Sequence, residues 1–282
     1  MESKRIINNS IGFQAYNVKL GIASDEEFYL KCVLERLDEI LPDGFEFIEE
    51  SEIEHLLEIK QKKDGNYQII YQIIKEGEVL ADWRKREDFF YLIESRIRLT
   101  VAEFAKDKVF LHAGAVGWRG EAIIIPASSF AGKTTLVAEL IKSGAAYYSD
   151  EYTILDEDGF VHPYPKKLSM RGIIDDYKQM DVAAESLGAV VGREPLPVGL
   201  VLICRFDKSV DNRKEFRAEI LSSGQGIIEL LAHSISIRNN PAFVLKVLNK
   251  VSSRAIIAKT RRGEAELFAA RLIASLNKGV FK

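Results

Sequence analysis

The feature that most constrains the fold is an apolar run that leads, through a short loop, into an amphipathic helix. The run is "AIIIP" at 122–126, the loop is "ASSFAG" at 127–132, and a helix is expected over about 132–143. An uninterrupted apolar run is typical of a strand that is covered on both faces. The apolar positions of the expected helix share one face: Leu136, Val137, Leu140 and Ile141. A strand, a loop and a helix in this order predict a layered α/β fold.

The loop has the residue types of a phosphate-binding P-loop, G-x-x-x-x-G-K-[ST], with Ala127 in place of the first glycine. Backbone N–H groups at a helix N-terminus favour phosphate oxygens, Lys133 reaches the β- and γ-phosphates, and the Thr134 hydroxyl is a Mg²⁺ ligand. A chance Gly-Lys-Thr is the alternative, but the strand before it and the helix after it are the context that the motif requires. The predicted nucleotide-binding residues are Ala127, Ser128, Ser129, Phe130, Ala131, Gly132, Lys133, Thr134 and Thr135.

An acidic pair, Asp150-Glu151, follows the next expected strand, "AAYYS" at 145–149. Two adjacent carboxylates most often form a solvated turn. Here they stand seventeen and eighteen residues after Lys133, at the C-terminal end of a strand, where α/β sheets bind ligands. We therefore predict that Asp150 and Glu151 hold Mg²⁺ together with Thr134, and that Asp150 is the candidate base.

These residues resemble the catalytic domain of HPr kinase/phosphorylase and the wider group of HPr-kinase-like proteins. His112, in "VFLHAGAV", lies fifteen residues before Ala127, and the acidic pair keeps the family's distance from the P-loop lysine. The segment "LSMRGII" at 168–174 is similar to the family's Leu-x-x-Arg-Gly-x-x, with Arg171 on the arginine. The resemblance is good over about 108–175. It implies a P-loop kinase-like mixed sheet flanked by helices, as in HPr kinases and PEP carboxykinases.

The function implied by this resemblance is an ATP-dependent, Mg²⁺-dependent kinase that transfers the γ-phosphate to a serine-type hydroxyl of a protein, peptide or small molecule. Asp150 would accept or orient the acceptor proton, His112 would sit across the γ-phosphate, and Arg171 would stabilise the transferring charge. Two alternatives are left open. One, favoured by Ala127 and by glutamate at 151 where the family has a second aspartate, is a nucleotide-binding sensor or maturation accessory without catalysis. The other is an NTPase that drives assembly of a partner.

The chain is expected to divide into an N-terminal α+β module, residues 1–107, and the P-loop domain, residues 108–282. In the module, 13–24 reads as a strand, Asp25 as the cap of the next helix, and 86–106 as a long helix. In the second domain the segment 163–197 has little periodicity and is expected to hold or cover an acceptor beside the P-loop.

Two further side chains with polar groups, an arginine and a histidine, need an interpretation. Arg262, in "TRRGEAE", is expected at the start of the last helix, which Gly263 would begin, with contact to an anion as the alternative. His233 lies beside Leu230 and Leu231 and is treated as a packing residue.

The amino-acid composition limits which kinds of partner and which cellular compartment we expect. Lys and Arg number 39 against 42 Asp and Glu, which leaves a net charge of −3 and gives no argument for nucleic-acid binding. No apolar stretch approaches the length of a bilayer span, so we expect no membrane partner and a cytoplasmic location. Cys32 and Cys204 read as core residues in a reducing compartment. Self-association into a homo-oligomer is left open.

Overall fold

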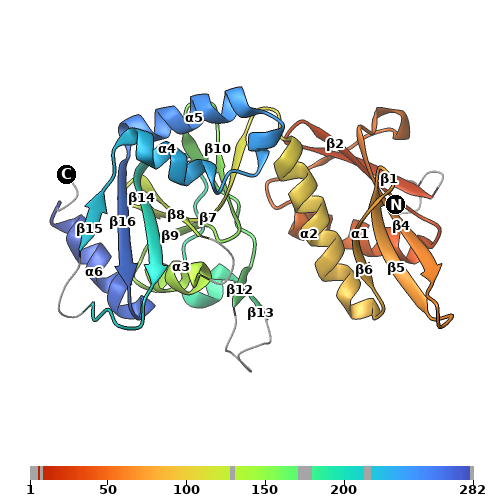
Figure 1. The fold of residues 1–282 in the computed structure, drawn as a ribbon, viewed down its shortest axis with the longest axis horizontal. Helices are drawn as coiled ribbons and strands as arrows, with labels where there is room; N and C mark the ends of the chain where they lie inside the picture. Colours follow the sequence, from red (N-terminus) through yellow and green to blue (C-terminus); the bar gives the residue numbers. More distant parts are fainter. Residues whose placement is uncertain (1–5, 7–8, 128–130, 171–179, 213–216, 280–282) are drawn as a thin grey trace. The chain divides into compact units, whose positions relative to one another are not determined.

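The computed structural model describes residues 6, 9–127, 131–170, 180–212 and 217–279 of the 282-residue chain. The chain separates into two compact units, Met1–Asp107 (unit 1) and Lys108–Lys282 (unit 2). They are drawn together in Figure 1, and each is described by itself.

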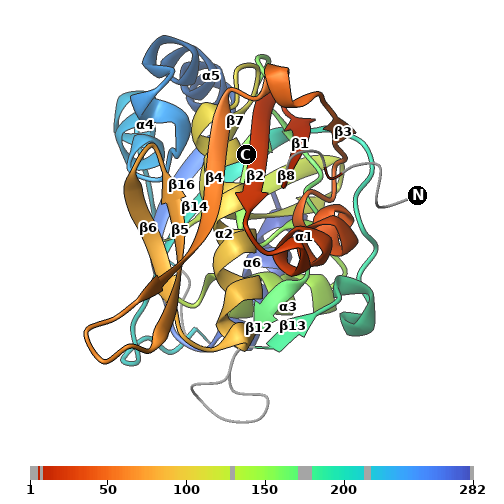
Figure 2. The ribbon, with the colours of Figure 1, turned by 90° about the vertical axis from the view of Figure 1, so that its right-hand side faces the viewer.

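Unit 1 is a six-stranded sheet in the order β3-β1-β2-β4-β5-β6 with two helices packed on it (Figure 2). The β2–β4 pair is parallel and the other pairs are antiparallel. The apolar positions of α1 recur at helical spacing, so one face of the helix is buried against β2 and α2. The elements are β1 (Ser10–Ala15), β2 (Val18–Ser24), α1 (Glu27–Ile40), β3 (Glu46–Phe47), β4 (His55–Lys63), β5 (Ile69–Lys75), β6 (Glu78–Trp83) and α2 (Arg86–Phe104).

Two details of unit 1 differ from the expectation. Residues 13–24 belong to a hairpin rather than to one strand, because Tyr16 and Asn17 both take positive φ, 51° and 61°, and turn the chain in two residues. The helix that follows has Glu26, not Asp25, at its N-cap, and Ser24 Oγ accepts a hydrogen bond from the Glu26 N–H at 3.1 Å. The predicted long helix over 86–106 is confirmed as α2.

Unit 2 is built on an eight-stranded mixed sheet in the order β11-β10-β7-β8-β14-β16-β15, with β9 also paired to β7. Strand β14 runs parallel to β8 and β16, while β7 is antiparallel to β8, β9 and β10. The strands are β7 (Val109–Trp118), β8 (Glu121–Pro126), β9 (Ala146–Ser149), β10 (Tyr152–Leu155), β11 (Phe160–His162), β14 (Leu196–Phe206), β15 (Ala218–Ile220) and β16 (Ile256–Arg262). The helices are α3 (Lys133–Lys142), α4 (Ser223–Leu231), α5 (Pro241–Arg254) and α6 (Ala265–Asn277).

Helices cover both faces of this sheet. Helices α3 and α6 pack against each other and against one face, and α4 and α5 pack together on the other (Figure 1). Strand β7 shows the alternation that two cores require: Leu111 and Ala113 face the α4–α5 core, whereas Val116 faces the α3–α6 core. The predicted mixed α/β fold with flanking helices is confirmed.

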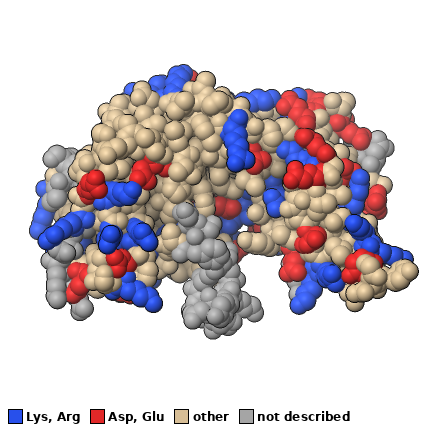
Figure 3. Space-filling view, in the orientation of Figure 1, with Lys and Arg blue, Asp and Glu red and all other residues tan. Residues whose placement is uncertain are grey.

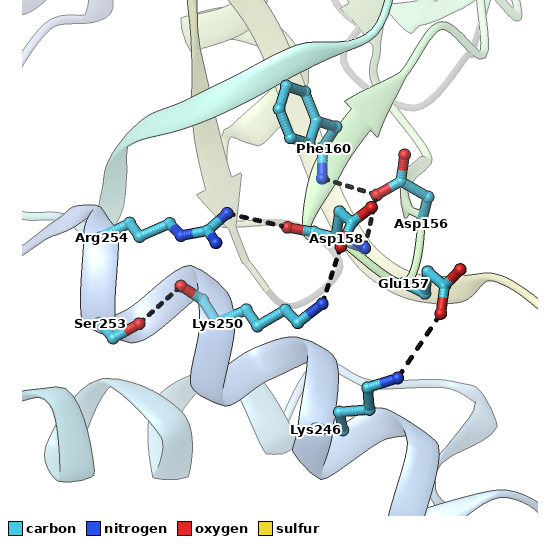
Figure 4. Close-up of polar contacts among 8 residues, drawn as sticks. All are labelled: Asp156, Glu157, Asp158, Phe160, Lys246, Lys250, Ser253 and Arg254. Carbon is cyan, nitrogen blue, oxygen red and sulfur yellow. Dashed lines mark hydrogen bonds and ion pairs between the residues drawn. The ribbon is translucent and has the colours of Figure 1, made fainter.

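The turn between β10 and β11 is fastened to α5 (Figure 4). Asp156 Oδ1 accepts hydrogen bonds from the backbone N–H groups of Asp158 and Phe160, at 3.0 and 2.9 Å, which closes the turn. Lys250 Nζ then contacts Asp158 Oδ1 at 2.8 Å, and Arg254 donates to the Asp158 carbonyl at 3.3 Å. Strand β10 begins directly after the acidic pair, so these contacts help to fix the strand that follows the candidate site.

The segment expected to be a long loop contains short elements in its described parts. Strands β12 (Leu168–Met170) and β13 (Met180–Val182) form an antiparallel pair, and a 3₁₀ helix spans Ala184–Leu187. On the face seen in Figure 3, Lys and Arg side chains are interspersed with Asp and Glu. Within the described parts of the chain, no helix has both the length and the apolar composition needed to cross a bilayer.

Candidate nucleotide site

The start of α3 has the backbone of a phosphate-binding turn. Gly132 is the N-cap, with φ 76° and ψ 26°, a left-handed conformation that glycine adopts without the strain imposed by a Cβ. Among the described residues no side chain caps this helix end, so the described contacts leave its first N–H groups available to a ligand. Ala127 lies directly after β8 and is buried. Its φ is not positive, so an alanine fits at this position without backbone strain. Thr135 is exposed, and the predicted Ser128, Ser129 and Phe130 lie outside the described residues.

Thr134 and Asp150 meet at this turn. Thr134 Oγ1 donates a hydrogen bond to Asp150 Oδ2 at 2.9 Å, and the Asp150 residue is only 6% exposed. The other carboxylate oxygen, Oδ1, is buried and has no hydrogen-bond partner among the described residues. Burial raises the pKa of Asp150, although the Lys133 charge and the Thr134 hydrogen bond act in the opposite direction. A buried acceptor without a donor is costly, so this oxygen is placed for a proton or a cation.

Lys133 enters the same space from the first position of α3. Burial lowers the pKa of its ammonium, and the charges of Asp150 and Glu151 oppose that effect. The stem of Lys133 passes over Gly114 of β7, where an added Cβ would lie 3.4 Å from Lys133 Cγ and 2.6 Å from Val137 Cγ2. Gly114 is therefore needed for the close approach of α3 to β7. Its only sequence signal was its place in "HAGAV".

Glu151 is paired with a lysine that sequence reasoning did not single out. Lys166 Nζ lies 3.1 Å from Glu151 Oε2, and the two side chains are only 14% and 24% exposed. The same ammonium donates to Ser169 Oγ at 3.2 Å. The only available signal was the "KK" of "PYPKKLSM", which resembles any exposed basic pair.

His112 lies on β7, where it pairs with Tyr152 of β10, the residue after the acidic pair. By strand alternation its side chain shares a face with Gly114, over which Lys133 packs. Burial lowers the pKa of His112 to about 4, and the positive charge of Lys133 acts in the same direction. The imidazole is therefore neutral at pH 7, so it offers one donor and one acceptor rather than a charge.

His233 also reaches this region, although the sequence suggests only a packing role. It lies just beyond α4, and its carbonyl accepts a hydrogen bond from the His112 N–H at 2.8 Å. Burial lowers the pKa of His233, and the Lys133 charge contributes in the same direction. Strand β7 thus brings both histidines close enough to Lys133 to respond to its charge.

Arg262 does not start the last helix, as one of the two expectations had it, and its contacts are with the P-loop-like turn. It is the last residue of β16, it is 4% exposed, and α6 begins only at Ala265 with Glu264 as N-cap, so neither Arg262 nor Gly263 starts that helix. Its Nη2 donates to the Gly132 carbonyl and its Nη1 to the Gly263 carbonyl, both at 2.9 Å. An added Cβ at 132 would lie 2.3 Å from Arg262 Nη2. Arg262 therefore anchors the backbone of the loop at Gly132. The missing Cβ of Gly132 leaves room for the Arg262 guanidinium.

The donors present fit a magnesium ion that is shared with phosphates. Thr134, Asp150 and Glu151 offer hard oxygen ligands, and Asp150 Oδ1 is the buried oxygen without a partner among the described residues. In the described residues no group of three or more His, Cys, Asp and Glu side chains is arranged to hold a metal by itself. Protein Mg²⁺ sites commonly combine one or two carboxylates with substrate phosphates and water. Arg171, the predicted charge-stabilising residue, lies outside the described residues.

Comparisons with known proteins add little to this geometry. No protein-family model matches the chain, and no curated protein sequence matches it. Among solved structures, the HPr(Ser) kinase/phosphatase from Coxiella burnetii is similar over 61% of this chain and 99% of its own, with 13% identity and a TM-score of 0.33. A likeness this low supports no inference about activity.

Proposed function

We propose that unit 2 is an ATP-dependent phosphotransferase that moves the γ-phosphate to a hydroxyl, in a protein, peptide or small molecule. The observation that carries the proposal is the contact between Thr134 of the P-loop-like turn and the buried Asp150, whose second oxygen has no partner among the described residues. A turn that only joined a strand to a helix would not need a buried carboxylate beside its lysine, because burying such a charge costs free energy.

The roles of the residues follow from their places. Lys133 and the N–H groups at the start of α3 bind the β- and γ-phosphates, and Arg262 keeps Gly132 in the conformation that this requires. When bound, Mg²⁺ would be held by Thr134, Asp150 and Glu151 and would neutralise phosphate charge. Phosphoryl transfer needs little covalent chemistry from the protein, so positioning and electrostatics are the main contributions.

Asp150 is the candidate base for the acceptor hydroxyl. Its pKa is raised by burial, which makes the carboxylate a stronger base than an exposed aspartate. His112, neutral at pH 7 because its pKa is lowered to about 4, orients groups by hydrogen bonding and adds no charge next to Lys133.

One observation favours the alternative of nucleotide binding without catalysis. Glu151 forms an ion pair with Lys166, so this carboxylate already has a cationic partner in the structure. A site that only senses a nucleotide needs Lys133 and the loop but does not need Asp150 as a base.

The test separates binding from chemistry. Affinity for Mg²⁺-ATP is measured by calorimetry, and transfer of a γ-³²P label is followed to free serine, to serine-containing peptides and to water. The variants are Lys133→Met and Asp150→Asn, with Lys142→Met as control, because Lys142 is a lysine of the same helix whose side chain is 48% exposed.

We expect Lys133→Met to weaken ATP binding by about 10- to 100-fold, the usual effect of losing a charge-assisted hydrogen bond. Asp150→Asn keeps an oxygen that can ligate Mg²⁺ but loses the base, so transfer should fall by about 10²- to 10⁴-fold, the range for a missing general base, and the affinity for Mg²⁺-ATP should fall far less. Release of phosphate to water alone would support the NTPase alternative. Binding without transfer or hydrolysis in the unmodified protein would support the sensor. Absence of ATP binding would refute all three.

A further inference from the structure

Lys166 lies at the centre of a chain of polar contacts that starts at the acidic pair. Its ammonium contacts Glu151 Oε2 at 3.1 Å and donates to Ser169 Oγ at 3.2 Å. Ser169 Oγ in turn donates to Asp181 Oδ1 at 2.9 Å, across the β12–β13 pair. The candidate site therefore continues beyond the P-loop to a second lysine, which belongs to a different segment of the chain.

The backbone fixes where this lysine lies. The hydroxyl of Tyr147, a fully buried residue of β9, donates to the Lys166 carbonyl. Two residues earlier, the Tyr164 N–H donates to the Tyr148 carbonyl at 2.8 Å. Residues 164–166 are thus held along β9, the strand that ends at the acidic pair. Lys166 owes its place to buried contacts and not to the chance position of a long surface side chain.

The charge of Lys166 is felt by the P-loop residues. It lowers the pKa of Lys133 by repulsion, and it helps to hold down the pKa of Asp150, which burial raises. Two ammonium groups therefore act on the Asp150-Glu151 pair, one from α3 and one from the segment that leads into β12. A shielded Lys–Glu pair contributes little to stability, because desolvation offsets the attraction, so stability alone does not account for it.

We propose that Lys166 is a second phosphate-binding lysine, which contacts the γ-phosphate of the bound nucleotide by exchanging Glu151 for phosphate oxygens. This inference rests on the proposed function of the site. It gives Glu151 and Lys166 linked roles: each neutralises the other in the free protein, and each takes a partner of opposite charge when the nucleotide arrives. The presence of the ion pair, which favours a non-catalytic site when taken alone, then describes only the nucleotide-free state.

The test is the ratio of the affinities for Mg²⁺-ATP and Mg²⁺-ADP, measured on the full chain by calorimetry. ADP lacks the γ-phosphate, so a lysine that contacts this group changes the affinity for ATP alone. We expect Lys166→Met to weaken ATP binding by about 10- to 100-fold, the effect of one lost charge-assisted hydrogen bond, and ADP binding by less than about 3-fold. Lys166→Arg should restore most of the affinity for ATP, because the positive charge is kept. Lys142→Met, which breaks an exposed Lys–Glu pair on α3, should change neither affinity.

The outcomes are distinct from those that test the proposed function. If the unmodified protein binds neither nucleotide, the proposed function and this inference both fail. If the unmodified protein binds both nucleotides and Lys166→Met leaves the ratio of the ATP and ADP affinities unchanged, only the assignment of Lys166 is overturned. Lys166→Gln, which can still donate to Ser169, provides a second reading if the methionine variant does not fold. A γ-phosphate contact predicts the same selective loss for ATP in this variant.

Discussion

The buried carboxylate of Asp150 should make the nucleotide-free protein less stable than it could be. Asp150→Asn removes the charge but keeps an oxygen that can accept the hydrogen bond from Thr134. The side chain has nearly the same volume, so no cavity is created. We therefore expect the variant to be more stable than the unmodified protein at pH 7, although it should lose phosphoryl transfer.

The sign follows from the pKa. Burial raises the pKa of Asp150 in the folded protein above the ordinary aspartate value of 3.8, so the folded state holds this proton more tightly than the unfolded chain. Stability from this group is therefore present below pH 3.8 and is lost as the pH rises through the folded pKa. Relieving such functional strain commonly adds about 0.5–2 kcal/mol to the free energy of unfolding. For a unit of this size, that gain raises the Tm by about 1–8 °C.

The assay is thermal unfolding of the full chain without nucleotide or Mg²⁺. The two tryptophans, Trp83 and Trp118, lie in different units, so a Trp83→Phe background leaves Trp118 to report on unit 2. The gain from Asp150→Asn should shrink as the pH is lowered from 7 through the raised pKa of Asp150 toward 3.8. Asp158→Asn, whose side chain is 65% exposed, is the matched control and should change the free energy of unfolding by less than about 0.5 kcal/mol. A lower Tm for Asp150→Asn, or a shift that does not depend on pH, would refute the reasoning.

The remaining predictions concern three residues that surround Lys133. The pKa of His112 falls to about 4 on folding, so the unfolded chain binds more protons between pH 6.5 and 4, and stability is lost over that window as the pH falls. After allowance for the partial exposure of His112 to solvent, the loss in free energy of unfolding is about 1–2 kcal/mol. Urea unfolding at pH 7 and at pH 4.5 should detect this loss in the unmodified protein, and His112→Asn should lack it. Arg262→Met should lower the free energy of unfolding by about 2–4 kcal/mol, because the buried bond to the Gly132 carbonyl is lost, and calorimetry should show weaker ATP binding; full affinity in this variant would contradict the role given to Arg262. Gly114→Ala should cost about 1–3 kcal/mol in urea unfolding, since its Cβ would lie 2.6 Å from Val137 Cγ2; unchanged stability would mean that α3 moves away freely.

Local elements were predictable where the signal lies within a few consecutive residues. The apolar run and the helical spacing after it placed β8 and α3 within about one residue of their observed bounds, because burial of both strand faces and one helix face dictates these patterns. The hairpin at Tyr16 and Asn17 was missed. Its turn is made by residues that adopt positive φ without the glycine that usually marks such turns.

The sequence predicted that Thr134 and Asp150 both lie near the ends of strands, because Thr134 follows one apolar strand and Asp150 follows the next. That their side chains meet at 2.9 Å is a fact of the tertiary structure. The same holds for the residues around them. Arg262 binds the carbonyl of Gly132 across 130 positions of sequence, and Lys166 reaches Glu151 from a segment whose backbone Tyr147 helps to hold along β9.

The sequence by itself determined the α/β pattern, the glycine-lysine-threonine turn and the acidic pair, since each depends on the chemistry of neighbouring residues. Only the tertiary structure decided which groups surround Lys133. Hydrogen bonds and ion pairs act over a few ångströms in space, and the pairing of strands, not separation along the chain, sets which residues come that close. Arg262, Lys166, Gly114 and His233 could therefore be recognised as parts of this site only after the sheet and its helices had brought them together.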